Sequence, residues 1–323
     1  MRRPAVGIFR GTARTHAGGV NSSRMRIRIS LPQQTLELHD EQGALLRRYS
    51  VSTAKNGAGE QSGSYCTPRG RHIVRAKVGA GATANAVFVR RRPTGEVWTP
   101  QLTEEFPGRD WILTRILWLS GKEPGRNRLG EVDTMRRYIY LHGSPDTVAM
   151  GAPGSIGCVR MRNSDIIELF DLVPPRTPVD IVEFGVEAGS WTELAAQARL
   201  VRETVFVKEQ SVPREIEMDE HDDVSRHVVA TDADGGAIGT GRLLPDGHIG
   251  RMAVLADWRG KGVGRALLER VLEEAGGRNM RHLALHAQTQ ACGFYRSFGF
   301  VEEGPEFMEA GIPHRTMVRS ISR

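Results

Sequence analysis

Two residues, Cys158 and His142, have the types and spacing needed for nucleophilic catalysis. Cys158 lies in the segment Ser-Ile-Gly-Cys-Val-Arg-Met, and His142 lies sixteen positions earlier, at the end of an expected strand. A thiol is mostly protonated at neutral pH, so it needs a base or a positive charge nearby in order to react. His142 can supply the base and Arg160 the charge, while the backbone around Gly157 can direct N–H groups at an oxyanion. The alternative is a structural cysteine with an unrelated histidine.

A second group of residues has the composition of a phosphate site. The turn Arg259-Gly260-Lys261-Gly262-Val263-Gly264 follows an apolar strand and leads directly into an amphipathic helix. Backbone N–H groups at a helix N-terminus and nearby basic side chains both favour a bound phosphate. The turn does not end in the GK[ST] of a Walker loop, and Arg265 replaces the third glycine of a dinucleotide fingerprint.

The elements that must position Cys158 and His142 are mainly strands. Apolar and polar residues alternate from Met25 to Leu31, which predicts a half-buried strand. Further strands are predicted over 35–38, 49–53, 137–141 and 179–182, with a short helix over 165–173. We interpret residues 79–130, rich in Gly, Pro, Arg and Trp, as mostly irregular. Residues 25–183 are therefore predicted to form a mainly β domain.

The pattern changes after Phe184. A linker is expected over 184–192, followed by an α+β domain over 193–323. Its predicted helices span 193–207, 263–275 and 290–297, and its predicted strands span 226–231, 237–244, 248–255 and 282–286. Leu267, Leu268, Val271 and Leu272 lie on one face of the central helix.

Length and composition agree with two globular domains. The chain has 323 residues, of which 39% are hydrophobic and 25% charged. No run of about 18 apolar residues predicts a membrane-spanning helix. The net charge of +6 is uneven: residues 1–24 contain five arginines and no acidic residue, 25–183 contain 22 basic and 17 acidic residues, and 184–323 contain 17 and 21.

Charge and cysteine content exclude several function classes. Without a helix-turn-helix, a zinc finger or an aromatic-basic strand motif, the positive charge does not predict a nucleic-acid partner. The cysteines, Cys66, Cys158 and Cys292, have neither metal-binding spacing nor a disulfide pattern, so no metal site is expected. Residues 1–24 lack the apolar core of a signal peptide and are interpreted as a disordered extension. A cytoplasmic location is therefore expected, with a periplasmic one as the alternative.

The first domain resembles the L,D-transpeptidase (YkuD-type) family. The resemblance rests on the His-Gly-Ser at 142–144, the Ser-x-Gly-Cys-Val-Arg-Met at 155–161, Val51-Ser52-Thr53, Thr67-Pro68-Arg69-Gly70 and the run 113–119, all in family order. It implies a β-sandwich that cleaves peptidoglycan tetrapeptide stems. By resemblance Cys158 is the nucleophile, His142 its base, and Gly143 or Ser144 orients the imidazole. Ser155, Gly157 and the Cys158 amide form the oxyanion region, and Arg160 and Ser144 contact the substrate.

One position departs from this family. Its histidine before Gly-Cys is Ile156 here, which removes a hydrogen-bonding side chain. Three alternatives stay open. The domain can be a cytoplasmic L,D-carboxypeptidase that trims muropeptides, an exported L,D-transpeptidase that cross-links peptidoglycan, or a muropeptide-binding module attached to an active acetyltransferase.

The second domain resembles the GNAT N-acetyltransferases, and its 309–314 segment resembles the ElaA-type subgroup. The resemblance rests on Arg-x-x-Gly-x-Gly at 259–264 between a strand and a helix, on Gly241-Arg242-Leu243 and on Phe294-Tyr295. It implies acetyl-CoA as cofactor and an amine of unknown identity as acceptor. By resemblance Tyr295 protonates the departing thiolate. The expected cofactor-binding residues are Met252, Ala253, Val254, Arg259, Gly260, Lys261, Gly262, Val263 and Gly264. Glu209, His227, His286 and His314 are candidate bases.

Overall fold

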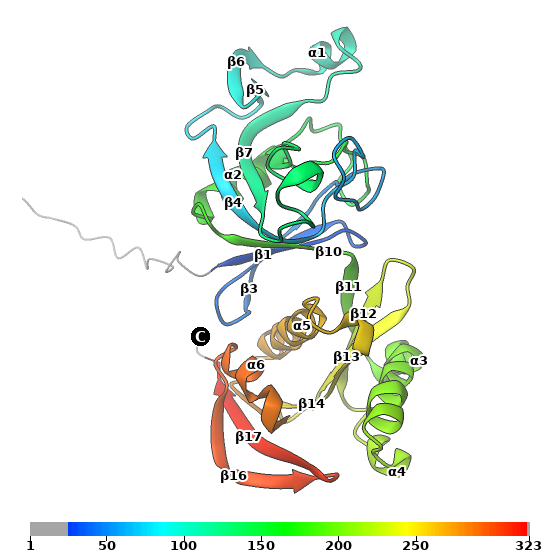
Figure 1. Ribbon diagram of the computed structural model, residues 1–323. Helices are drawn as coiled ribbons and strands as arrows, with labels where there is room; N and C mark the ends of the chain where they lie inside the picture. Colours follow the sequence, from blue (N-terminus) through cyan, green and yellow to red (C-terminus); the bar gives the residue numbers. More distant parts are fainter. Residues whose placement is uncertain (1–24, 322–323) are drawn as a thin grey trace, which may run out of the picture.

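The computed structural model describes residues 25–321 and contains two sheets, one in each half of the chain (Figure 1). The predicted extension over 1–24 lies outside the described residues. Among the residues described, no helix is both long and apolar enough to cross a membrane. The fold class is the predicted one, a mainly β domain followed by an α+β domain.

The first domain is one continuous sheet of ten strands. The order is β3-β2-β1-β10-β4-β7-β5-β6, with β8 paired to β7 and β9 paired to β8. The strands are β1 (Arg26–Ser30), β2 (Thr35–His39), β3 (Leu45–Ser50), β4 (Gly70–Val78), β5 (Ala86–Val89), β6 (Arg92–Val97), β7 (Ile112–Gly121), β8 (Tyr140–Gly143), β9 (Val159–Met161) and β10 (Pro178–Val182). The helices are α1 (Pro100–Glu105), the 3-10 turn η2 (Gly130–Val132) and α2 (Asn163–Leu172).

Strands from both ends of this sheet line one core. Ile27 of β1, Leu119 of β7 and Val159 of β9 all pack with Leu169 of α2 in the same buried cluster. The sheet therefore curves around α2, and its β8–β9 end is fixed by core packing. This places the segments that carry His142 and Cys158 side by side.

The second domain is a seven-stranded sheet in the order β11-β12-β13-β14-β15-β17-β16. The strands are β11 (Phe184–Gly189), β12 (Arg226–Asp232), β13 (Ala237–Leu243), β14 (His248–Val254), β15 (His282–Gln288), β16 (Val301–Glu309) and β17 (Ile312–Ser320). The helical segments are α3 (Trp191–Arg202), the π-helical η3 (Glu203–Glu209), α4 (Arg214–Glu217), η4 (Ala256–Trp258), α5 (Val263–Gly277), η5 (Thr289–Ala291) and α6 (Cys292–Arg296).

Capping and amphipathicity explain the two long helices of this domain. Ser190 and Glu193 form a capping box that starts α3. Helix α5 starts after Gly262, whose φ of 91° is left-handed, and buries Leu267, Leu268 and Val271 against the sheet. At the end of α3, the fully buried Arg202 pairs with Glu217 and with Asp222.

Two sequence predictions are wrong about local structure. The expected linker over 184–192 is instead β11, an edge strand paired antiparallel with β12, followed at Trp191 by α3. The segment 79–130 is not mostly irregular, because β5, β6, α1 and the ten-residue β7 lie within it. Strand β7 is buried on both faces, so its apolar residues, which include the run from Ile116 to Leu119, do not follow a period of two.

The two domains pack directly against each other, since only Glu183 separates β10 from β11. Ser30 Oγ donates to the Phe184 carbonyl at 2.8 Å. Arg28 bridges Glu37 of its own domain and Glu269 of α5, at 2.5 Å in both cases. In Figure 1 helix α5 accordingly lies just below β1 and β10.

Candidate active sites

Strands β8 and β9 place the histidine and the cysteine on one face of the first sheet. They run parallel with Leu141 opposite Val159 and His142 opposite Arg160, and Cys158 immediately precedes β9. Leu141 and Val159 point into the core. Because side chains alternate along a strand, His142, Cys158 and Arg160 lie on the opposite face.

Hydrogen bonds indicate which atoms of Cys158 and His142 carry protons. The Tyr140 N–H donates to Cys158 Sγ at 3.4 Å, and the thiol donates to the Tyr138 carbonyl at 3.4 Å. His142 Nδ1 lies 2.8 Å from the Gly143 carbonyl. A carbonyl oxygen only accepts, so Nδ1 carries the proton and Nε2 carries the lone pair. Nε2 is buried and has no partner within the described residues.

Burial keeps both groups uncharged. It raises the pKa of Cys158 to about 12, although the Tyr140 N–H and the charge of Arg160 oppose this shift. Burial also lowers the pKa of His142, against the attraction of Asp110. At rest, a neutral thiol and a neutral imidazole that can accept a proton at Nε2 therefore share one strand face.

The predicted neighbours of this pair have different roles. Gly143 orients the imidazole through its carbonyl, and a Cβ there would come within 2.4 Å of Asn163 Oδ1. Ser144 is buried, and its hydroxyl donates to the Met161 carbonyl at 3.1 Å, which ties β8 to β9. Arg160 lies on the Cys158 face, where it donates to Asp110 at 2.6 Å.

The turn before Cys158 is held by Ser155. Its hydroxyl donates to the Cys158 carbonyl at 2.5 Å and accepts from the Gly157 N–H at 3.2 Å. Thr67 Oγ1 donates to the Gly157 carbonyl at 3.0 Å, which brings the Thr-Pro-x-Gly motif to the site. The side chain of Ile156 is 47% exposed, so it points away from the core.

Sequence reasoning missed several residues around Cys158. Asp110, the partner of Arg160, comes from the segment interpreted as irregular. Arg91 stacks over Trp118 and Tyr138, at 4.5 and 4.8 Å from the ring centres, and donates to Tyr140 Oη at 2.9 Å. In the sequence, the only indication of Arg91 and Asp110 is the high content of Arg and Trp in the segment 79–130.

The central strands of the second domain separate where the cofactor is expected. Parallel strands β14 and β15 pair only at His248–Ala284 and Ile249–Leu285, although both continue further. The pairing between β13 and β14 shifts register beside Arg251, whose φ is 54°. The edge of β14 at Met252 therefore faces a gap instead of a partner strand.

The glycine-rich turn lies between this gap and α5. A Cβ added at Gly260 or Gly262, both with left-handed φ, would meet no atom within 4 Å. Arg259 donates to the Val254 carbonyl at 3.0 Å and forms a two-point ion pair with Glu209. Open space above helical N–H groups, with basic residues beside it, suits a pyrophosphate.

A cavity of about 460 Å³ extends from the gap and is lined by both Met252 and Tyr295. Burial raises the pKa of Tyr295 to about 12. His286 lies in the same wall with Nδ1 3.0 Å from Glu309, and its ring is 5.0 Å from that of His248.

Of the other candidate bases, one lines this cavity and two lie elsewhere. His314 lines the same cavity as His286. His227 is instead buried, with Nε2 2.9 Å from the Asp222 carbonyl, and Glu209 is the ion-pair partner of Arg259. The sequence analysis did not name His248 or Glu309 as candidate bases or as partners of His286, because the three residues come from separate strands.

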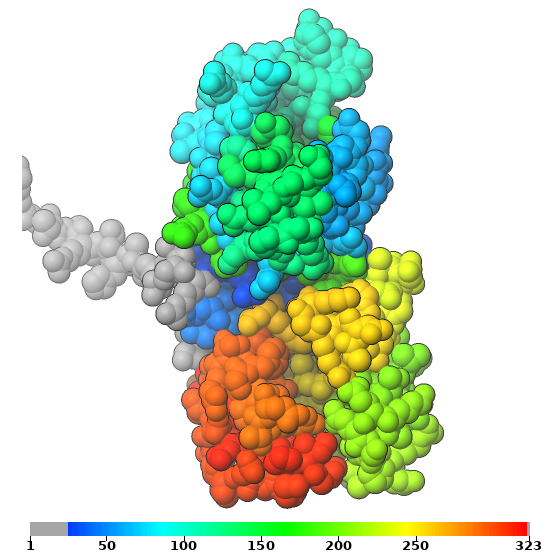
Figure 2. All heavy atoms as spheres, in the orientation of Figure 1, coloured from blue at the N-terminus to red at the C-terminus, as the bar shows by residue number. Residues whose placement is uncertain are grey.

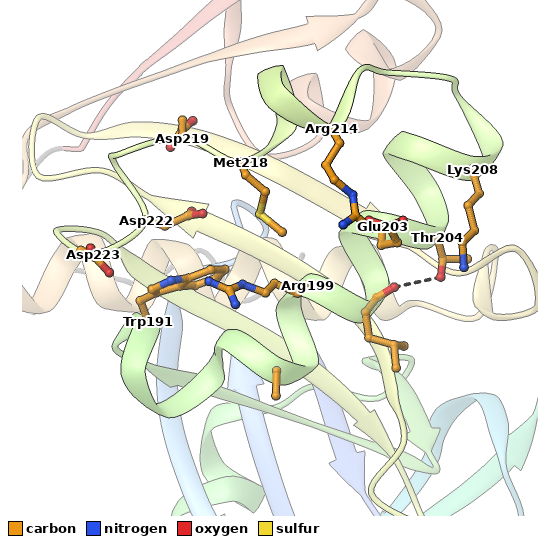
Figure 3. Close-up of a pocket in the computed structure, with 12 residues that line it drawn as sticks. Trp191, Arg199, Glu203, Thr204, Lys208, Arg214, Met218, Asp219, Asp222 and Asp223 are labelled. Atoms are coloured by element: carbon orange, nitrogen blue, oxygen red, sulfur yellow. Dashed lines mark hydrogen bonds and ion pairs between the residues drawn. The ribbon is translucent and has the colours of Figure 1, made fainter.

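A further cavity lies on the outer side of α3, away from these motifs. It has a volume of about 740 Å³, and Arg199 stacks 4.9 Å above the Trp191 ring in its wall (Figure 3). Arg214 and Glu203 form an ion pair across one end. None of the residues predicted for catalysis or cofactor binding lines it.

Family models match both halves of the chain. The L,D-transpeptidase catalytic domain (YkuD) matches residues 24–181, and the acetyltransferase (GNAT) domain matches residues 191–321. The uncharacterized N-acetyltransferase YjcF of Bacillus subtilis is 40% identical over 131 residues, which are 39% of this chain and 93% of YjcF. The UPF0039 protein Mb2876c of Mycobacterium bovis is 35% identical over 128 residues, 37% of this chain and 80% of that protein.

Solved structures also align with the second domain. An acyl-CoA N-acyltransferase from Pseudomonas aeruginosa is 30% identical with a TM-score of 0.39, covering 42% of this chain and 99% of that one. Escherichia coli ElaA is 28% identical with a TM-score of 0.39, covering 42% and 99%.

The chain is thus an enzyme of two fused domains, an L,D-transpeptidase-type domain and an acetyltransferase domain. Through the second domain it belongs to the GNAT family, and its cofactor is acetyl-CoA. The separated strands, the open glycine turn and the cavity beside Met252 fit this cofactor.

Proposed function

We propose that the first domain is a cysteine acyltransferase and peptidase acting on peptidoglycan tetrapeptide stems, and that the second domain acetylates an amine. The observation that carries the first proposal is the unpartnered, buried Nε2 of His142 on the same strand face as Cys158. The match to the L,D-transpeptidase catalytic domain supports this choice of substrate class.

In the proposed first reaction, His142 Nε2 takes the thiol proton as Cys158 Sγ attacks the carbonyl carbon before the terminal D-Ala. The carbon–nitrogen bond then breaks, His142 returns the proton to the leaving amine, and D-Ala departs from a thioester on Cys158. Water or another amine attacks this thioester and regenerates the thiol. The Cys158 N–H, at the end of the turn that Ser155 holds, stabilises the oxyanion.

Mass spectrometry of a disaccharide tetrapeptide tests this reaction. The full chain should release D-Ala, Cys158→Ala should release none, and the matched variant Cys66→Ala should behave as wild type. Release that survives Cys158→Ala contradicts the assignment. Binding of the muropeptide without release by the wild-type chain supports the binding-module alternative instead.

For the second domain, the carrying observation is that Met252 and Tyr295 line one cavity with the His286–Glu309 pair. Acetyl-CoA, when bound, supplies an acetyl group activated as a thioester. Tyr295 keeps its proton at neutral pH and can donate it at Oη. Because Glu309 only accepts when ionised, His286 carries its proton on Nδ1 and can accept another at Nε2.

Kinetics of Tyr295→Phe test the second assignment. We expect kcat to fall by about 10²- to 10⁴-fold, the usual contribution of a general acid, with KM for acetyl-CoA little changed. A Phe variant with wild-type kcat contradicts the role of Tyr295. We place both activities in the cytoplasm, where acetyl-CoA is available, and periplasmic signal from a localisation fusion would support the exported alternative.

A further inference from the structure

A third cavity lies at the junction of the two domains, and the glycine-rich turn forms part of its wall. It has a volume of about 380 Å³, within the range of small-molecule sites. Trp258, Gly260, Lys261, Gly262 and Arg265 line it from the second domain. Strands β1, β4 and β10 and the loop after β7 line it from the first domain. In Figure 2 the gold surface of residues near 260 lies directly below the first domain.

The lining of this junction cavity has an excess of positive charge. The first domain contributes five arginines, namely Arg26, Arg28, Arg69, Arg71 and Arg126. The second domain adds Lys261 and Arg265, while four carboxylates, those of Glu123, Asp180, Glu183 and Glu269, lie in the same wall. Seven cationic and four anionic side chains leave the lining three positive charges in excess.

Three of these arginines are held in short ion pairs. Arg26 lies 2.8 Å from Asp180, and Arg28 and Arg69 each contact two carboxylates at 2.9 Å or less. All three arginines line the cavity, and the Arg28–Glu269 pair also joins the two domains. The three arginines could bind a ligand anion only by breaking these ion pairs.

Arg71, Arg126 and Lys261 have weaker or fewer partners. The side chain of Arg71 is 74% exposed and lies 3.6 Å from Glu123, the same carboxylate that Arg126 contacts at 3.0 Å. Lys261 makes no ion pair within residues 25–321, and its Nζ lies 5.0 Å above the Trp258 ring. These three side chains can therefore reorient toward a bound anion at a small cost in free energy.

A single coenzyme A molecule has the shape to reach from the proposed acetyl-transfer site to the junction cavity. Its pyrophosphate lies between the pantetheine arm and a 3′-phosphorylated adenosine. When the pyrophosphate binds to the turn and the pantetheine arm lies in the gap beside Met252, the phosphorylated adenosine must extend from the turn in a different direction from the arm. The junction cavity opens there, since Gly260 and Gly262 line it and carry no side chain that would close it.

We propose that the first domain completes the cofactor site: the 3′-phosphate of acetyl-CoA binds in the junction cavity to Arg71 and Arg126 of the first domain together with Lys261. This inference rests on the proposed acetyltransferase function of the second domain. It also means that the cofactor bridges the domains, so that its binding and the domain contact stabilise each other.

Calorimetric titration of the full chain with CoA and with 3′-dephospho-CoA tests this inference without an activity assay. The wild-type chain should bind CoA about tenfold more tightly than dephospho-CoA, as expected for charge-assisted hydrogen bonds to phosphate. The Arg71→Ala/Arg126→Ala variant should lose most of this difference and bind dephospho-CoA as wild type does. Arg75→Ala is the control, because Arg75 is exposed on the same strand β4 and does not line the cavity.

The outcomes separate the two proposals. If the double variant binds CoA as tightly as wild type, the inference fails, and the acetyltransferase proposal stands. Equal weakening of both ligands also overturns it, because the arginines would then not recognise the 3′-phosphate. If the wild-type chain binds neither ligand, the proposed acetyltransferase function itself fails. Thermal unfolding checks that each variant is folded. The single variant Arg126→Gln should lose an intermediate amount of affinity for CoA and none for dephospho-CoA.

Discussion

The neutral resting state of Cys158 makes a quantitative prediction about its reactivity. With a pKa of about 12, roughly one thiol in 10⁵ is ionised at pH 7, against about 3% for a free cysteine of pKa about 8.5. The thiolate fraction is therefore lower by about 10^3.5. A thiolate of higher pKa is intrinsically more nucleophilic, by about 10^1.5 for this shift. Alkylation of Cys158 should be about 100-fold slower than that of a free cysteine.

Iodoacetamide labelling followed by peptide mapping measures this rate, because mapping separates Cys158 from Cys66 and Cys292. Since burial raises the pKa of the thiol, the rate should rise about tenfold per pH unit from pH 6 to 10. His142→Ala should change the rate little, because the imidazole is already neutral. Rapid labelling at pH 7 that collapses in His142→Ala would refute the reasoning, since it would show a thiolate–imidazolium pair at rest.

Three further substitutions test the packing of the second domain and its contacts. Arg202→Ala should lower the free energy of unfolding by about 3–5 kcal/mol in urea titrations, because it removes the nearest cation from buried Glu217 and one of the two arginines that pair with Asp222, whereas exposed Lys208→Ala should have little effect. Gly43→Val should cost about 1–3 kcal/mol and loosen the domain contact to proteolysis, because Gly43 has a φ of 81° and its Cβ would lie 2.5 Å from the Phe298 ring. Gly262→Val should weaken CoA binding at least about tenfold in calorimetry, because a branched side chain there fills the open space over the helical N–H groups; unchanged affinity would contradict this placement.

The sequence predicted about half of the strands, among them β1, β2, β10 and β12 to β15, because their apolar residues alternate or follow clear turn signals. It did not predict β4, β5, β6, β9, β16 or β17. It failed at β7, where burial on both faces removes the alternation. It also failed at β11, where Gly185 and Gly189 gave the segment the composition of a linker. The β11 segment is a strand because β12 provides a partner edge, which local sequence does not reveal.

The candidate sites were predictable to the extent that they lie in short motifs. His142, Cys158 and the glycine-rich turn are local patterns with known chemistry. The His286–Glu309 pair and the junction cavity are not local, because their residues come from separate strands or separate domains. Only the docking of α5 against β1 brings Arg71 and Lys261 to one cavity, and nothing in their sequence neighbourhoods indicates it.

The most direct test of the central claim is to trap the acyl-enzyme of the first domain. The full chain is mixed with a tetrapeptide stem, quenched in acid and mapped by mass spectrometry. The account predicts a thioester-linked tripeptide on the peptide that contains Cys158, together with at least one free D-Ala for each adduct, because completed turnovers also release D-Ala. An adduct on Cys66 or Cys292, or D-Ala release without any adduct on Cys158, would contradict it.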